Sequence, residues 1–120
     1  MIPEAIDQII FDLIQDKYLD EERFAQSFAR GKFKTKKWGK NRIILELKRR
    51  EISQYLIKKA LLQIDDIEYL ETFEALSQKR YNQIKSEKDR YKKRKKLADY
   101  LLYRGWPGDW VYAKAKELFP

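Results

Sequence analysis

The side chains that could do chemistry in this sequence are cations and aromatic rings. The chain contains no histidine and no cysteine, which excludes imidazole and thiolate catalysis, disulfides and cysteine-ligated metals. Asp65 and Asp66 form an adjacent carboxylate pair, but adjacent side chains diverge on a helix, so we interpret them as a helix cap. The sequence has no glycine-rich phosphate loop. We therefore expect a protein that is not an enzyme and uses no cofactor or metal.

The cations are gathered in two stretches of an otherwise acidic chain. Residues 30–50 hold ten Lys or Arg against Glu46, a net charge of +9, and residues 88–96 hold seven against Asp89, a net charge of +6. The whole chain carries only +8, so the remaining residues sum to −7. Such segregation suits a partner with opposed charges, either a polyanionic nucleic acid or a protein that sits on one.

The candidate partner-binding residues come from these two stretches and from one aromatic pair. In the first stretch, cations could neutralise phosphates while Phe33 or Trp38 stacks on bases, or the stretch could be a solvated face with Trp38 in the core. The second stretch could bind phosphate, dock on an acidic protein surface or only solvate a helix start. An aromatic ring beside a guanidinium is typical of interface hot spots, whereas Trp106 better suits packing of the last helix. The candidates are Lys36, Lys37, Lys40, Arg42, Arg49, Arg50, Lys92, Lys93, Arg94, Tyr103 and Arg104.

Hydrophobic periodicity predicts helices along the whole chain. Ile6, Ile9, Ile10, Leu13 and Ile14 have the spacing of one amphipathic face. The acidic run that begins at Asp20 predicts the cap and first turn of a second helix. Residues 31–41 contain two glycines, Gly31 and Gly39, and no helical apolar spacing, which predicts a basic loop. Further helices are expected over residues 41–50, 53–64, 66–87, 90–103 and 107–118.

The later helices repeat the earlier ones at an offset of 54 residues. Leu47, Arg50, Ile52 and Ile57 shift onto Leu101, Arg104, Trp106 and Val111. A unit of three short helices cannot bury its apolar face alone, so it must pack against its neighbour. We therefore expect a curved tandem array of helical units.

Several motifs in order resemble the RecX family of recombination regulators: YLDEERFAQSF (18–28), Gly39, Arg42, ILELKRREI (44–52) and LADYLLYRGW (97–106). The resemblance covers nearly the whole chain. It implies an all-α fold of tandem three-helix repeats forming a curved, elongated, right-handed array. It divides the chain into the last helix of a truncated first repeat (1–19), a second repeat (20–64) and a third repeat (65–120).

The sequence departs from the family's pattern at Glu51, where the second repeat usually has glycine, whereas Gly105 keeps the pattern in the third. Glycine takes left-handed backbone conformations without steric cost. The helix before Glu51 must therefore end through a different turn, or with Glu51 in a strained conformation.

The resemblance also implies a function. The chain would be a regulatory protein that binds the RecA recombinase filament and inhibits its ATPase and strand-exchange activity in DNA repair, recombination and the SOS response, with contacts to single- or double-stranded DNA. Since MIPEAIDQ lacks the features of a leader and no long apolar run follows, we expect a soluble, cytoplasmic monomer without membrane contacts. The alternatives are an independent DNA-binding module that grips phosphates, and a helical scaffold for an unrelated acidic protein.

Overall fold

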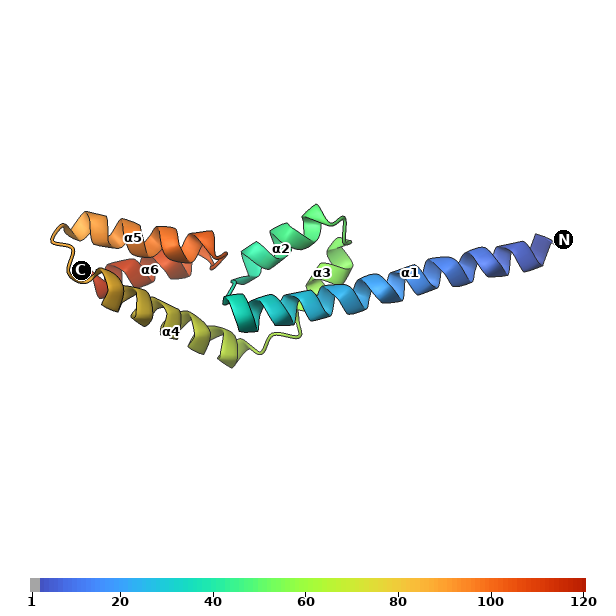
Figure 1. The fold of residues 1–120 in the computed structure, drawn as a ribbon, viewed down its shortest axis with the longest axis horizontal. Helices are drawn as coiled ribbons and strands as arrows, with labels where there is room; N and C mark the ends of the chain where they lie inside the picture. Colours follow the sequence, from blue (N-terminus) through green and yellow to red (C-terminus); the bar gives the residue numbers. More distant parts are fainter. Residues whose placement is uncertain (1–2) are drawn as a thin grey trace.

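The computed structural model describes residues 3–120, and every regular element in that range is helical (Figure 1). The predicted all-α class is therefore confirmed. The elements are α1 (Pro3–Gly31), the π-helix η1 (Lys32–Lys36), α2 (Lys40–Arg49), α3 (Gln54–Leu61), α4 (Asp66–Ile84), α5 (Arg90–Tyr103) and α6 (Gly108–Leu118).

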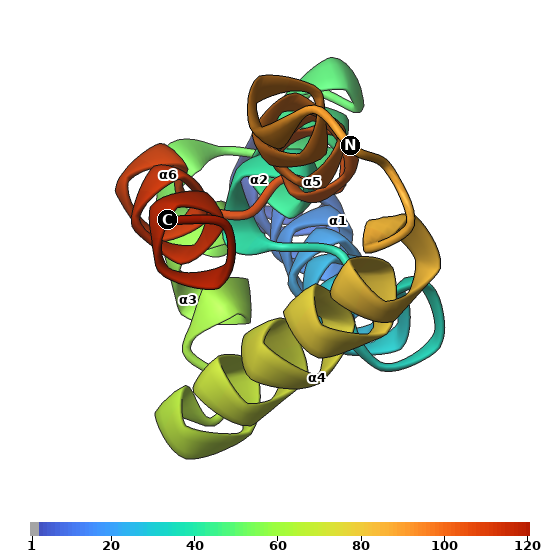
Figure 2. The same ribbon diagram turned by 90° about the vertical axis from the view of Figure 1, so that its left-hand side faces the viewer.

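The helices form two units that follow one another along the long axis of the molecule. The end of α1 packs with α2 and α3, and α4, α5 and α6 form the second unit, while the beginning of α1 projects away as an arm (Figures 1 and 2). The molecule measures 76 × 23 × 19 Å with a radius of gyration of 20.0 Å, whereas a compact chain of this length would have about 14 Å. The expected tandem, elongated arrangement is confirmed, and the right-handed curvature stays a prediction.

α1 continues through the acidic run where a new helix was predicted to start. Asp20 lies inside α1, so the predicted cap there is wrong. No glycine or proline interrupts the helix, and apolar spacing continues from Ile14 through Tyr18, so the helix propagates without a new nucleus. Glu22 instead reaches across to α3, where its Oε1 lies 2.6 Å from Nζ of Lys59.

The predicted basic loop over residues 31–41 is only partly a loop. The chain leaves α1 through η1, in which the Thr35 hydroxyl donates to the carbonyl of Gly31 at 2.7 Å. Phe33 holds this turn to the body because its ring is only 2% exposed, so the suggestion that Phe33 stacks on bases is wrong. Trp38 is half-buried and packs against the core, as in the alternative interpretation of that stretch.

The predicted caps of α3 and α4 are present. The Ser53 hydroxyl accepts from the backbone N–H of Leu56 at 3.2 Å, and the Asp65 carboxylate accepts from Glu68 at 3.0 Å. Each bond satisfies a donor that the first helical turn leaves without a partner.

The same turn ends α2 and α5, as the 54-residue offset predicts. The N–H of Ile52 donates to Leu47 at 3.1 Å, and the N–H of Trp106 donates to Leu101 at 3.2 Å. Both turns need a left-handed residue, with φ of 61° at Glu51 and 91° at Gly105. Of the two alternatives for the end of α2, the structure therefore has the strained Glu51.

An aromatic cluster joins the two units. Trp106 is 1% exposed, and its ring centroid lies 4.5 Å from that of Tyr69 and 5.4 Å from that of Phe73. Phe33, from the first unit, lies 5.8 Å from Tyr69. Trp106 is buried in the core, as its predicted packing role requires, and its aromatic neighbours come from α4.

Candidate interaction surface

The start of α2 meets the end of α5 at the junction of the two units. The N–H of Gly39 donates to the carbonyl of Arg104 at 2.7 Å, and the N–H of Asn41 donates to Gly105 at 3.0 Å. Donors at a helix start and acceptors at a helix end are thereby satisfied together, with favourable dipole alignment. A Cβ at Gly39 would overlap the backbone of Gly105, and one at Gly105 would overlap Arg42. Backbone contacts therefore fix the junction.

Arg42 spans this junction. Its guanidinium carbon lies 4.7 Å from the ring centroid of Trp38 and 4.8 Å from that of Tyr103, and Nη1 donates to the Tyr103 carbonyl at 3.0 Å. The structure thus brings together two candidate residues that are 61 positions apart. A guanidinium stacked on two rings keeps its charge while the rings exclude water from its faces.

Further cations and rings extend this contact on both sides. Lys32 lies over Phe28 and Trp38, at 5.6 and 5.2 Å, and Arg50 lies over Phe28 at 4.8 Å. On the second unit, Tyr100 has Arg104 at 3.8 Å and Arg80 at 5.1 Å from its ring centroid. We call this set the cation–aromatic row: Phe28, Lys32, Trp38, Arg42, Arg50, Arg80, Tyr100, Tyr103 and Arg104.

Glu46 organises the cations of α2. Its carboxylate lies 2.9 Å from Arg49, 3.4 Å from Arg50 and 3.6 Å from Arg42. One half-buried carboxylate therefore orients three guanidinium groups and leaves a local excess of positive charge. In the charge pattern Glu46 stands out only as the single acid of its stretch, although its spacing of three or four residues to each of these arginines also predicts the contacts.

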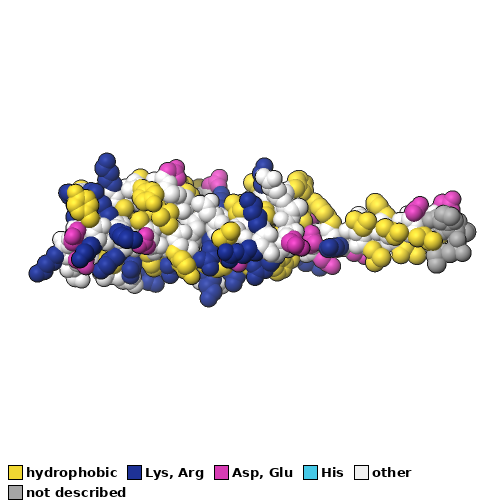
Figure 3. Space-filling model, turned by 90° about the horizontal axis from the view of Figure 1, so that it is seen from above, with side chains coloured by type: hydrophobic (Ala, Val, Ile, Leu, Met, Phe, Trp, Pro, Cys, Tyr) yellow, Lys and Arg dark blue, Asp and Glu magenta, His cyan; other side chains and the backbone are white. Residues whose placement is uncertain are grey.

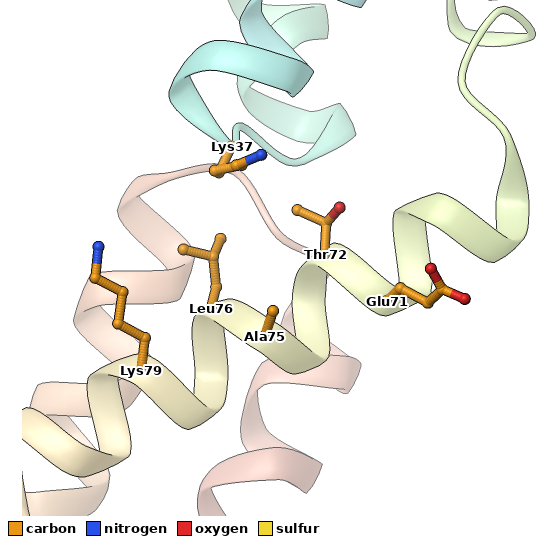
Figure 4. Close-up of a pocket in the computed structure, with 6 residues that line it drawn as sticks. All are labelled: Lys37, Glu71, Thr72, Ala75, Leu76 and Lys79. Carbon is orange, nitrogen blue, oxygen red and sulfur yellow. The ribbon is translucent and has the colours of Figure 1, made fainter.

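Lys36 and Lys37 are exposed, whereas Lys40 is held inside the junction. Lys37 overhangs a shallow hollow of about 310 Å³ on α4, which also involves Leu76 and Lys79 (Figure 4). Nζ of Lys40 lies 4.7 Å from the Tyr69 ring centroid, and the Lys40 N–H donates to the Tyr69 hydroxyl at 2.9 Å. Burial raises the pKa of Tyr69 to about 12, although the bond from Lys40 acts in the opposite direction.

The cations at the start of α5 mostly serve the end of the chain. Nε of Arg94 donates to the Phe119 carbonyl at 2.6 Å, and Nζ of Lys93 lies 5.5 Å from the Phe119 ring centroid. These charges complement the carbonyl end of α6. Lys92 is exposed, and it lies about 16 Å along α5 from Tyr103. The structure therefore does not bring this stretch together with the junction.

Seen from the side of α2 and α5, the cations spread over the two units, whereas the projecting part of α1 is mainly apolar and acidic (Figure 3). Within residues 3–120 there is no cluster of three potential metal-ligating side chains. None of the helices in that range combines the length and apolar character needed to cross a bilayer.

An elongated array of three-helix units defines a helical-repeat protein. The family model described as "RecX, second three-helix domain" matches residues 20–61, and that described as "RecX, third three-helix domain" matches residues 66–114. The chain belongs to the RecX family. These ranges fall inside the expected second and third repeats, while the assignment of residues 1–19 to a first repeat stays a prediction.

Curated relatives agree with this assignment. The chain is 33% identical over 115 residues to "Regulatory protein RecX" of Clostridium botulinum (strain Alaska E43 / Type E3), covering 95% of the chain and 53% of the relative. It is 31% identical over 105 residues to "Regulatory protein RecX" of Serratia proteamaculans (strain 568), covering 87% and 60%. The chain thus spans between half and two thirds of these relatives. No solved structure matches it.

Proposed function

We propose that this chain is a non-catalytic regulator that binds the RecA filament and inhibits its ATPase and strand-exchange activity. The observation that carries the proposal is the cation–aromatic row, which crosses the junction of two rigidly joined units in a RecX-family fold. Stacked and ion-paired cations have already lost most of their side-chain freedom, so binding an acidic surface costs less entropy. A rod-shaped body also suits a partner whose binding sites repeat along an axis.

Inhibition follows if the chain prefers one conformation of the filament. A bound protein shifts a conformational equilibrium only by the difference between its affinities for the two states. A chain that binds the less active state more tightly therefore lowers ATP hydrolysis without touching the nucleotide. The exposed candidates for this contact are Lys36, Lys37, Arg49, Arg50, Lys92 and Tyr103.

The test is ATP hydrolysis by RecA on single-stranded DNA, titrated with the 120-residue chain. We expect hydrolysis to fall with saturation. The double variant Lys36→Glu/Lys37→Glu should need about tenfold more protein for the same inhibition, since two attractive contacts become repulsive. Lys85→Glu, an exposed charge reversal at the end of α4, is the control. Unchanged hydrolysis at saturating chain would contradict the proposal.

A second candidate function is independent DNA binding, which the exposed Lys34, Lys36, Lys37 and Lys48 favour. Among the described residues, none of them has a carboxylate within 4.0 Å. Direct phosphate contacts predict that log affinity for a DNA duplex falls steeply with log salt, by about 0.9 for each phosphate neutralised. Fluorescence anisotropy without RecA measures this slope, and weak binding with a shallow slope would remove this candidate.

A further inference from the structure

A groove of about 620 Å³ lies at the junction of the two units, between the start of α2, the end of α3, the start of α4 and the start of α6. Binding sites usually have volumes of about 300–1,000 Å³. In Figure 2, α3 and α6 lie on the left, whereas η1 and the end of α4, which carry Lys32 and Arg80 of the cation–aromatic row, lie on the right. The groove therefore opens on another side of the molecule than that row.

Both units that enclose this groove are present in the chain. The residues that line it lie between positions 40 and 110, well inside the sequence. In a tandem array each unit packs against its neighbours along the axis. Here the first unit supplies the α2 and α3 side of the groove, and the second unit supplies the α4 and α6 side. The walls of the groove are therefore complete in this chain.

The floor of the groove is apolar and aromatic. Tyr69 is 4% exposed, and its ring centroid lies 5.5 Å from that of Trp110. Ile44 and Leu61 are partly buried against the core, and Leu70 is 48% exposed. Such a surface gains free energy when an apolar side chain of a partner covers it, and buried anchors of this kind dominate interface energetics. The floor therefore suits one apolar anchor.

Carboxylates stand at the rim of this floor, although the whole chain has a net charge of +8. Asp109 is exposed and, among residues 3–120, has no Lys or Arg nitrogen within 4.0 Å. The Asp66 side chain is 97% exposed and lies 3.9 Å from Nζ of Lys40. Both acids are in the first turns of α4 and α6, where they also offset the helix dipoles. The rim therefore disfavours an anionic partner and accepts a cation.

Lys40 shows how a cation fits this groove. Its Nζ lies 4.7 Å from the ring centroid of Tyr69 and 3.9 Å from the carboxylate of Asp66. An aromatic face and a carboxylate thus hold one ammonium group together. Trp110 and Asp109 line the same groove and provide a second ring and a second carboxylate. The groove therefore offers a partner's cation the kind of contacts that Lys40 already makes.

We propose that this groove binds a short segment of a partner protein in which an apolar side chain is flanked by lysine or arginine. The apolar side chain covers the floor, and a basic neighbour lies against Trp110 and Asp109. The covered apolar surface supplies most of the affinity, and the carboxylates select basic over acidic segments. The inference goes beyond the function proposed above, because the cation–aromatic row attracts acidic surfaces instead.

The first experiment follows NMR chemical shifts of the 120-residue chain during titration with three seven-residue peptides. Their central residues are Arg-Leu-Arg, Glu-Leu-Glu and Arg-Ser-Arg. We expect the Arg-Leu-Arg peptide to shift the indole N–H of Trp110 and the amide of Leu70 with a Kd of about 1 mM or below. The other two should bind there at least about tenfold more weakly, because one meets like charges and the other lacks the apolar side chain.

The second experiment alters the groove in two variants with matched controls. Leu70→Ser removes part of the floor, and Leu19→Ser is its control, because both leucines are 48% exposed and Leu19 lies on α1. Asp109→Lys reverses a rim charge, and Asp16→Lys, at an exposed carboxylate on α1, is its control. Each groove variant should weaken Arg-Leu-Arg binding about five- to tenfold, whereas the controls should stay within about twofold. Circular dichroism checks that each variant remains helical.

Three results would overturn the proposal. If the Trp110 and Leu70 signals do not move at about 5 mM Arg-Leu-Arg peptide, the groove does not bind such a segment. Equal binding of the Glu-Leu-Glu peptide in the groove would exclude a basic occupant. Unchanged affinity in both groove variants would mean that the peptide binds elsewhere. Since neither RecA nor DNA is present, these results are independent of the function proposed above.

Discussion

At the scale of single residues, Glu51 shows what a turn costs when its sequence does not suit it. The same hydrogen bonds close the turns at Glu51 and Gly105. Glycine adopts left-handed φ without steric cost because it has no Cβ, whereas the Cβ of any other residue clashes with the backbone there. For a residue with a side chain this conformation costs about 1–2 kcal/mol. The turn therefore requires a left-handed backbone conformation, and Glu51 adopts it under strain.

Replacing Glu51 with glycine should therefore stabilise the protein. We expect Glu51→Gly to raise the free energy of unfolding by about 1 kcal/mol, after the larger unfolded-state entropy of glycine is deducted. Urea denaturation measures the change, and Glu51→Ala, which keeps the Cβ, is the control. A Glu51→Gly variant no more stable than Glu51→Ala would show that the conformation is not strained.

The buried Tyr69 hydroxyl should make stability depend on pH in the alkaline range. Its pKa is about 12 in the folded chain and about 10 in an unfolded chain. Since the raised folded-state pKa means that the folded chain holds the proton more tightly, this stabilisation is complete below pH 10 and is lost as the pH rises from 10 to 12.

Tyr69→Phe tests this dependence. At pH 7 the variant should be less stable by about 1 kcal/mol, because the N–H of Lys40 loses its acceptor. Above pH 10 this deficit should shrink by about 1 kcal/mol per pH unit, since phenylalanine does not ionise. Urea midpoints at pH 7, 9, 10 and 11 measure it, with Tyr112→Phe, at an exposed ring, as the control. A deficit that is constant up to pH 11 would contradict the expected loss.

The sequence singled out residues of the candidate surface but not their arrangement. The charge count singled out Arg42, and Tyr103 was chosen as a possible hot spot. Their contact depends on the junction of two units, and no local spacing encodes a pair 61 positions apart. The Glu46 contacts are local and could have been predicted, whereas the Arg80 contact with Tyr100 depends on the packing of α4 against α5.

At the scale of elements, the junction depends on the absence of side chains. Gly39 and Gly105 allow the start of α2 to meet the end of α5 backbone to backbone. Gly31 provides a contrast, because a Cβ there meets nothing within 4 Å and its φ of −64° is helical. In the connection between α1 and α2, Gly39 therefore has no room for a side chain, whereas Gly31 has room for one.

Alanine at these two glycines should have effects of opposite sign. Gly39→Ala should destabilise the chain by about 2–3 kcal/mol, because backbone atoms must move apart. Gly31→Ala should stabilise it by up to about 1 kcal/mol, since alanine is the better helix former. Thermal unfolding followed by circular dichroism compares them, and equal melting temperatures would show that the close approach does not matter.

Helix positions were largely predictable, and the errors have a common cause. α2, α4 and α5 lie close to their expected ranges because caps such as Asp65 and the C-terminal Gly105 mark their limits. The prediction at Asp20 is wrong because Asp20 followed by Glu21 and Glu22 looks the same inside a long helix as at the start of a new one. The absence of glycine and proline and the apolar spacing from Ile14 to Tyr18 distinguish the two cases, and the contact of Glu22 with Lys59 of α3 supports the continuous helix.

At the scale of the whole molecule, the two units should unfold together. Main-chain bonds, the Trp106 indole that donates to the Lys37 carbonyl at 3.1 Å, and Phe33 all connect them. Units coupled so closely behave as one cooperative body. Native-state hydrogen exchange should therefore give the slowest amides of α3 and α5 the same opening free energy, within about 0.5 kcal/mol. A gap of several kcal/mol would mean that the units open independently.

Since the angle between the units is set by main-chain atoms, side chains on the surface can vary without altering it. Homologous chains could thus acquire different charges and still present their contacts at one constant pitch. Against a helical partner, that pitch would act as a ruler for the distance between successive subunits.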